Sequence, residues 1–232
     1  MRRVLVPFMF GLLGAAILIS LGVWQVQRLA WKEALLAEID ARVGGAPGAL
    51  PDLVDPARDK YAPVAVTGDI LTPELHVLVG AKDLGAGYRV IQPFETNGRR
   101  IMVDRGFIPL DAKDAPRAVG QVRLIGNLHW PDEKDSYTPE PDIDKNIWFA
   151  RNVPAMAAVL GTEPVLLVVR QQEGGEQSGI TPLPVGREGI ANDHLQYAIT
   201  WFSLAFIWLM MTGYLLWRLR RPAARKDSRS GT

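Results

Sequence analysis

The stretch VLVPFMFGLLGAAILISLGVWQVQ, from Val4 through Gln27, contains no charged residue over 24 positions. A second stretch, LQYAITWFSLAFIWLMMTGYLLW, runs from Leu195 through Trp217 and is also free of charge. A helix that rises about 1.5 Å per residue needs roughly 20 apolar residues to cross a hydrocarbon core of about 30 Å. Both stretches are long enough and nothing between them is. The sequence therefore predicts two transmembrane helices, one toward each end of the chain.

The charges of the 232-residue chain are divided unevenly around these two stretches. Arg2 and Arg3 give the N-terminal tip a charge of +2, and the segment after Trp217 carries +5. Residues 28–194 contain 18 basic and 24 acidic residues, a net charge of −6. Because basic flanks of membrane helices stay on the cytoplasmic side, both termini are expected inside and the acidic middle outside.

A cleaved signal peptide is the alternative reading of the first stretch. The stretch is longer than a typical signal-peptide core, and no clear pair of small residues marks a cleavage site before Trp24. Helical periodicity then continues from Arg28 to Val43, with Leu29, Leu36 and Ile39 near one face. These features favour a permanent helix that extends beyond the membrane.

The resulting organisation is an α+β membrane protein, with two transmembrane helices flanking a mainly antiparallel β domain that holds one short helix. Residues 1–27 form the first transmembrane helix, 28–43 its extension, 44–194 the extracytoplasmic domain, 195–217 the second transmembrane helix and 218–232 a basic cytoplasmic tail. Within the domain, 44–59 is expected to be a linker or an irregular entry, and Asn152–Leu160 a helix with Asn152 as its cap. The predicted strands, arranged as a small barrel or sandwich, are Tyr61–Ile70, Leu75–Gly80, Tyr88–Phe94, Arg100–Ile108, Val122–Leu128, Ile147–Arg151 and Val165–Gln171.

Several function classes lack their residues in this sequence. The chain has no cysteine, which excludes thiol redox chemistry, thiolate copper delivery and covalent haem attachment. It contains no HExxH, GxSxG, P-loop or GxGxxG motif, and no spacing typical of an enzyme site is visible. The carboxylates between Asp132 and Asp144 lie in a proline-rich loop, and a solvated acidic loop is favoured over a metal or acid–base site.

His194 stands immediately before the second uncharged stretch. This position places an imidazole at the outer membrane boundary, near the beginning of a helix. A neutral imidazole can bind a metal or haem iron through one nitrogen while a hydrogen bond fixes the other. The alternative is an interfacial histidine that only meets lipid headgroups.

Trp24 and Gln25 occupy the matching boundary of the first helix, and Gln196, Tyr197 and Trp201 lie near the same level on the second. For the aromatic residues the plain interpretation is an interfacial belt. If the two helices pack antiparallel, however, Gln25, Gln196 and His194 converge at one depth, where polar groups seek partners. A flat apolar ligand with one coordinated atom would fit such a place.

Three further residues have an ordinary interpretation. Arg105 ends a predicted strand, and a structural ion pair with an acidic loop is favoured over an anion site. His76 and His129 fall within the domain and are expected to be surface or strand histidines, so neither is predicted to be a second ligand.

Taken in order, these motifs resemble the Surfeit locus protein 1 family, called Shy in yeast. The resemblance rests on Leu21-Gly22-Val23-Trp24-Gln25 with Arg28 and Trp31-Lys32, on Tyr61-Ala62-Pro63-Val64 with Gly68, on Asp104-Arg105-Gly106-Phe107-Ile108-Pro109, and on Asn192-Asp193-His194-Leu195-Gln196-Tyr197-Ala198 with Thr200-Trp201. Each piece alone is weak, but their order over nearly the whole chain is specific. Asp104 and Asp193 stand where the family often has Asn.

The resemblance implies a non-enzymatic assembly factor for haem-copper cytochrome c oxidase in respiratory chain biogenesis. It implies transient binding of haem a, with His194 as iron ligand and Trp24, Gln25, Gln196, Tyr197 and Trp201 around it. Expected partners are cytochrome c oxidase subunit I, the haem a synthase and the lipid bilayer, and no nucleic acid. Because no transit peptide precedes the first stretch, the expected location is the bacterial cell inner membrane, with the domain in the periplasm.

Other functions stay open beside this one. A membrane scaffold that binds no haem could stabilise an assembly intermediate of oxidase subunit I. A membrane-bound sensor is disfavoured because only about 15 residues follow the second helix, too few for an output domain. An enzyme is disfavoured by the missing motifs, although catalytic residues can assemble from distant positions.

Overall fold

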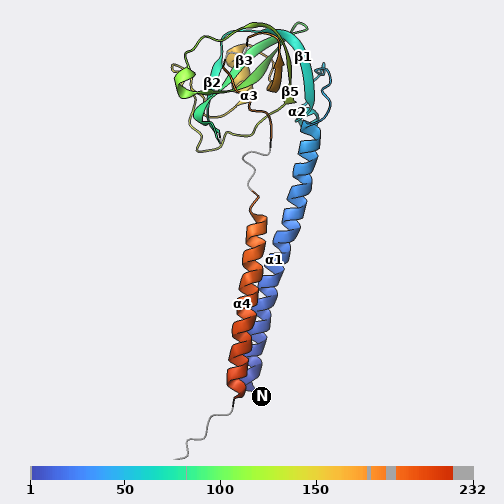
Figure 1. Cartoon of the computed structure of the whole chain (residues 1–232), viewed down its shortest axis with the longest axis vertical. Helices are drawn as coiled ribbons and strands as arrows, with labels where there is room; N and C mark the ends of the chain where they lie inside the picture. The colour runs from blue at the N-terminus through green and yellow to red at the C-terminus, as the bar shows by residue number, and fades with distance from the viewer. Residues whose placement is uncertain (1, 82, 177–178, 187–191, 222–232) are drawn as a thin grey trace, which may run out of the picture. The chain divides into compact units, whose positions relative to one another are not determined.

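The computed structural model describes residues 2–81, 83–176, 179–186 and 192–221. The chain divides into two compact units. The first comprises Met1–Ala37 and Gly189–Thr232, and the second comprises Glu38–Glu188. The first unit is helical and the second is built around a sheet (Figure 1).

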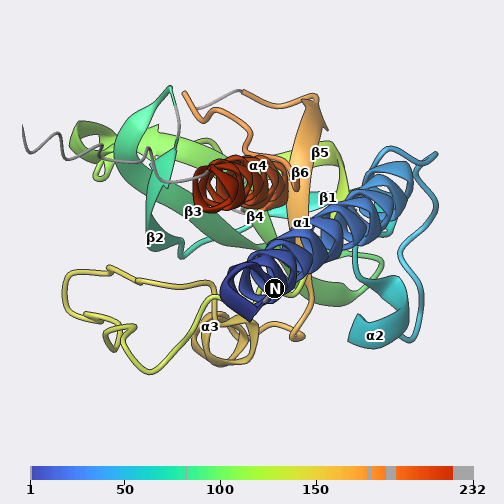
Figure 2. The same ribbon diagram turned by 90° about the horizontal axis from the view of Figure 1, so that it is seen from below.

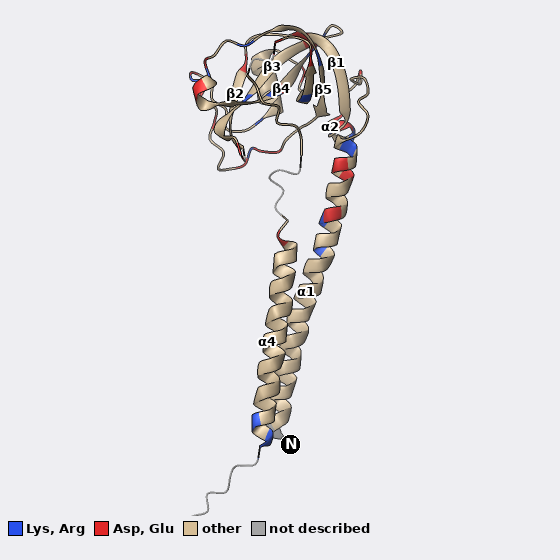
Figure 3. Ribbon diagram, in the orientation of Figure 1, with Lys and Arg blue, Asp and Glu red and all other residues tan. Residues whose placement is uncertain are grey.

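Two long helices form the first unit. Helix α1 spans Arg2–Val43, so the predicted membrane stretch and its extension are one continuous helix, and α4 spans His194–Arg220. Both are long and apolar enough to cross a membrane, and in Figure 3 their central stretches are tan, without the colours of Lys, Arg, Asp or Glu. These two helices bear out the prediction of two candidate spans near the ends of the chain.

The two helices lie antiparallel, because Gln25 of α1 meets His194 while Gly11 meets Trp208, in reverse chain order. Small residues lie where they touch: Ala15, Ala198 and Ala205 are all buried. A Cβ at Gly22 would lie 2.8 Å from the ring of Phe202, so a larger residue there would require this ring to move. In lipid, where apolar burial gives little driving force, such close approach of backbones is a main source of helix association.

The described part of the second unit forms one six-stranded sheet, in the order β1-β5-β6-β4-β3-β2. The strands are β1 (Pro63–Ile70), β2 (Leu75–Ala81), β3 (Gly85–Thr96), β4 (Arg99–Pro109), β5 (Gly120–Leu128) and β6 (Leu166–Glu173). Two short helices, α2 (Pro56–Asp59) and α3 (Val153–Leu160), and the 3-10 turn η1 (Leu110–Ala112) complete it. Figure 2 shows the strands from below, with α3 beside them.

The sheet closes into a barrel because β1 also pairs with β3, through Asp69 with Glu95 and Ile70 with Phe94. The closed ring is β1-β5-β6-β4-β3, with β2 added outside on β3. A ring with an odd number of strands cannot be antiparallel throughout. The one parallel pair among the described strands joins β4 to β6, and all other pairs are antiparallel, as predicted.

Two apolar clusters account for most of the burial in this unit. The barrel interior is filled from alternate positions of its strands, including Val64, Phe94, Ile101, Leu124 and Leu167. A second cluster lies outside the barrel, where Met156 and Leu160 of α3 cover Met102, Leu166 and neighbouring side chains. Helix α3 begins as predicted: the Asn152 side chain accepts a hydrogen bond from the N–H of Ala155, and Pro154 lies in the first turn.

One prediction for this unit was wrong. Ile147–Arg151 is not a strand; only single bridges occur there, one of them between Trp148 and Val77 of β2. The segment is apolar because Trp148 is buried in the cluster under α3. Residues 44–59 are mostly irregular and end in the four-residue helix α2, which begins at Pro56 after Asp55 accepts a hydrogen bond from the N–H of Ala57.

Candidate functional site

The candidate site lies where α4 begins. His194 is the first residue of α4, and its Nδ1 lies 2.8 Å from Oε1 of Gln25 on α1. Gln25 is 8% exposed and stands out as a buried amide in an otherwise apolar helix pair. The two residues are 169 positions apart in sequence, so only the antiparallel packing of the two helices joins them.

The hydrogen bond to Gln25 determines which nitrogen of His194 carries the proton. An amide oxygen can only accept, so Nδ1 donates its hydrogen to Oε1. In the neutral ring Nε2 then has no hydrogen and keeps a free lone pair. Ligands of metal ions in proteins are arranged in this way, with one ring nitrogen fixed by a hydrogen bond and the other facing the metal.

Asn192, two residues before His194, contributes a second open group. Its Oδ1 is buried and accepts no hydrogen bond from the described residues. Buried carbonyl oxygens normally have a donor. The acceptor is therefore available to a hydroxyl or amide hydrogen of a ligand.

The aromatic residues predicted for this site lie on the surface of the helix pair. Trp24 is 54% exposed and Tyr197 is 55% exposed, while Trp201 is half-buried. Gln196 is also exposed. The structure thus joins Gln25 with His194 by a direct hydrogen bond, and leaves Trp24, Gln196 and Tyr197 facing outward where lipid or a ligand can contact them.

Arg28 and Trp31, which both belong to the motif at the end of the first uncharged stretch, contact each other. The guanidinium carbon of Arg28 lies 4.1 Å above the centre of the Trp31 ring. This is a cation–π arrangement. It places a positive charge one turn beyond Gln25.

Arg105 does not form the ion pair predicted for it. It is buried, and it donates to three neutral oxygens, Gln92 Oε1 at 2.9 Å, the Ala118 carbonyl at 3.1 Å and Gln172 Oε1 at 3.4 Å. Burial lowers the pKa of its guanidinium. Arg105 therefore holds strands together and offers no anion site.

The ion pairs of this region are formed by its neighbour Asp104, which stands where the family often has Asn. Asp104 is fully buried, and its Oδ2 accepts from Arg89 at 2.9 Å and from Arg151 at 3.2 Å. Arg151 also binds Glu133 of the acidic loop. Burial opposes ionisation of Glu133, but the hydrogen bonds and charge of Arg151 outweigh it and lower its pKa. These contacts are structural.

The two other histidines lie in the barrel unit. His76 is a buried residue of β2 and contacts Glu74 at 2.8 Å through Nε2. His129 is stacked on Tyr61, with 5.3 Å between ring centres, and burial lowers its pKa to about 4. Among the described residues, no group of three His, Cys, Asp or Glu side chains could hold a metal ion, the acidic loop included.

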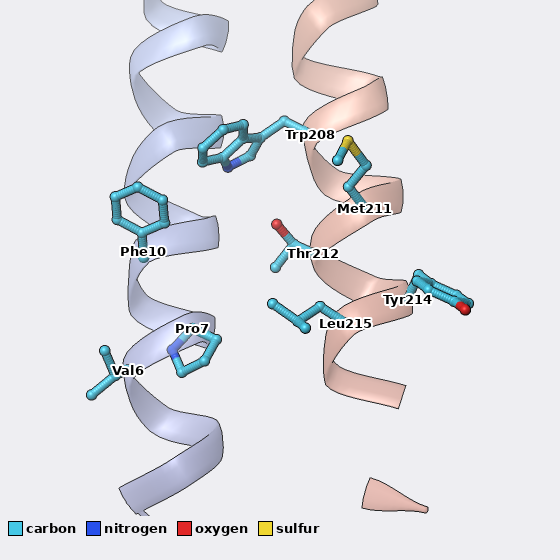
Figure 4. Close-up of a pocket in the computed structure, with 8 residues that line it drawn as sticks. All are labelled: Val6, Pro7, Phe10, Trp208, Met211, Thr212, Tyr214 and Leu215. Carbon is cyan, nitrogen blue, oxygen red and sulfur yellow. The ribbon is translucent and has the colours of Figure 1, made fainter. Parts of the chain in front are cut away.

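At the other end of the helix pair is an apolar cleft of about 600 Å³ (Figure 4). It is lined by side chains from both helices, among them Phe10, Trp208 and Leu215. The indole N–H of Trp208 is already bonded to the Gly11 carbonyl at 2.9 Å. Such an apolar lining suits the interior of a bilayer, and it contains no histidine.

Comparison with known proteins matches residues 12–206 to the sequence model of the SURF1 family. Surfeit locus protein 1 from Xenopus tropicalis is 33% identical over 214 residues, covering 80% of this chain and 67% of the relative. The Homo sapiens protein of that name is 32% identical over 213 residues, covering 80% and 69%. A SURF1-like protein from Rickettsia conorii is 31% identical over 218 residues and covers 89% of each chain.

Proposed function

Because this chain belongs to the SURF1 family, we propose that it is an assembly factor for haem-copper cytochrome c oxidase that binds haem a at the outer membrane boundary. In this role it assists insertion of the haem into subunit I. The observation that carries the proposal is the His194–Gln25 hydrogen bond, which leaves Nε2 of His194 free to bind iron.

The residues at this site fit the chemistry of a haem. A haem is a flat apolar ring with one metal atom, so it needs one nitrogen ligand and an apolar surface. His194 supplies the ligand, and the exposed aromatic side chains of Trp24, Tyr197 and the half-buried Trp201 supply surface on the two helices. When bound, the haem contributes an iron centre that accepts the Nε2 lone pair. Gln25 holds the imidazole in the required tautomer.

The proposed topology places the haem site on the outer side of the bacterial inner membrane. Arg2, Arg3 and the arginines that follow α4 keep both termini in the cytoplasm, and the acidic barrel unit faces the periplasm. The barrel unit would dock subunit I or the haem a synthase. No step of this function requires the protein to catalyse a reaction, so we propose a chaperone and not an enzyme.

Purification from a host that makes haem a tests the proposal. The wild-type chain should carry a Soret band with about one haem per chain, and His194→Ala should lose it. Imidazole added to His194→Ala should restore part of the band, because it fills the site of the missing side chain. A variant that retains the full spectrum without imidazole would show that His194 is not the ligand.

The alternative is a scaffold that stabilises an oxidase intermediate and binds no haem. The exposed apolar surface of α1 and α4 favours contacts with other membrane helices. If the chain is such a scaffold, the wild type should co-purify with subunit I and should show no stoichiometric Soret band. His194→Ala should also leave that co-purification unchanged.

A further inference from the structure

Arg28 is the first charged residue of α1 after the uncharged stretch. It follows Gln25 by three positions, a rise of about 4.5 Å along the helix axis. Residues three apart are neighbours on a helix surface. The backbone of Arg28 is therefore within one turn of Gln25, the hydrogen-bond partner of His194, on the side away from the membrane centre.

Cation–π contacts of arginine stack the flat face of the guanidinium on an aromatic ring, and Cζ of Arg28 lies 4.1 Å from the centre of the Trp31 ring. In such a stack the N–H groups lie around the edge of the guanidinium, where they can donate hydrogen bonds. No described carboxylate forms an ion pair with Arg28. This differs from Arg89 and Arg151 in the barrel unit, which both bind Asp104.

We propose that Arg28 binds a carboxylate of the haem, one of the two propionates on its polar edge. This inference rests on the proposed function, because it assumes that His194 binds the iron. A guanidinium matches a carboxylate with two parallel N–H···O bonds, and Trp31 fixes the plane in which these N–H groups lie. The haem is then held at two points, with its propionate edge outward and its apolar edge toward the uncharged stretches of α1 and α4.

A lipid phosphate is the other anion that an arginine meets at a membrane boundary. Both groups present oxygen atoms with negative charge, so the ligand must be varied to distinguish them. Haem b carries the same two propionates as haem a, and its dimethyl ester lacks their charge. A comparison of these two probes isolates the contribution of the carboxylates.

The test uses the full chain in a detergent without phosphate, titrated with ferric haem b and with its dimethyl ester while the Soret band is recorded. Arg28→Gln should weaken binding of haem b by about fivefold to tenfold, and should leave binding of the ester unchanged. Arg218→Gln removes an equal charge at the other end of the helix pair and should change neither affinity.

Two outcomes would overturn the role of Arg28. One is equal binding of haem b by the wild type and Arg28→Gln. The other is an equal loss for haem b and the ester, which would indicate a disturbed helix surface. If Arg28→Gln instead weakens only the association with phosphatidylglycerol vesicles, the lipid phosphate is its partner and the inference is wrong.

The same titration separates this inference from the proposed function. His194→Ala should abolish binding of both probes. If His194→Ala abolishes binding of both probes while Arg28→Gln binds them as the wild type does, the proposed haem binding is supported and only the propionate contact is wrong. If the wild type binds neither probe and also carries no haem a after purification from a host that makes it, both proposals fall together.

Discussion

Asp104 of the barrel unit and His194 of the helix pair differ in how many of their polar atoms have hydrogen-bond partners. In the barrel, Asp104 accepts hydrogen bonds from Arg89, Arg151 and the N–H of Gly106, so its oxygens are satisfied inside the protein. Among the described residues of the helix pair, His194 forms one hydrogen bond, with Gln25, and its Nε2 has no described partner. A buried polar group that finds all its partners stabilises a fold, whereas one left with an open atom at a surface can bind a ligand.

The largest effect on stability is expected for a substitution of Asp104. Asp104→Ala leaves Arg89 and Arg151 without their shared carboxylate, and loss of one partner of a buried ion pair costs about 3–5 kcal/mol. Denaturant unfolding of the detergent-solubilised chain should show this loss. Haem affinity per folded molecule should not change. A loss below about 1 kcal/mol would mean that the buried pairs contribute little to stability.

The next effect is expected at Gln25. Gln25→Leu removes the acceptor that orients His194, and loss of such an orienting partner typically lowers metal affinity about tenfold to a hundredfold. A titration with haem followed at the Soret band measures it. Gln27→Leu, an identical change at an exposed position of the same helix, is the matched control. Equal affinities for the two variants would contradict the role of Gln25.

A smaller effect concerns pH and His129 of the barrel. Burial lowers its pKa to about 4, below the ordinary value of about 6.5, so the unfolded chain takes up the proton first as pH falls. The contribution of neutral His129 to the free energy of unfolding is complete above about pH 6.5 and is lost as pH falls toward 4. The loss is no more than about 1.4 kcal/mol per pH unit. His129→Phe keeps a ring against Tyr61 and should flatten this part of the stability curve. An unchanged slope would show that other groups cause it.

The smallest effect is expected on the surface of the barrel. Arg123 and Glu173 form an ion pair at 2.9 Å, with exposed side-chain fractions of 52% and 42%. Exposed pairs contribute about 0–1 kcal/mol because water and salt screen them. Glu173→Gln should therefore change the free energy of unfolding by less than about 0.5 kcal/mol. A larger change would show that this pair resembles the buried ones.

Much of the fold follows from local patterns. Six of the seven predicted strands form, and α3 begins at its predicted cap, because alternation of apolar residues and cap chemistry act over a few neighbouring residues. Ile147–Arg151 was mistaken for a strand because a short apolar run does not reveal what it packs against. Trp148 is buried under α3 by a contact that only the folded chain provides.

The candidate site, like the fold, follows only in part from the sequence. His194 could be placed at the membrane boundary by sequence, and Gln25 and Gln196 were equally good candidates to meet it. The structure selects Gln25 and leaves Gln196 exposed, because the packing of small residues such as Gly22 and Ala198 sets which faces of α1 and α4 meet. The role of Asp104 was missed for a similar reason, since Arg151 is 47 positions away.

The sequence by itself determined the two apolar helices, the strands between them and the position of one histidine at a helix end. These features depend on hydrophobic runs and periodicities, which act locally along the chain. The tertiary structure alone decided the closure of the barrel with its parallel pair, the pairing of Asp104 and the contact between His194 and Gln25. Each of these depends on which distant groups come within hydrogen-bond distance, and that is settled only when helices and strands pack.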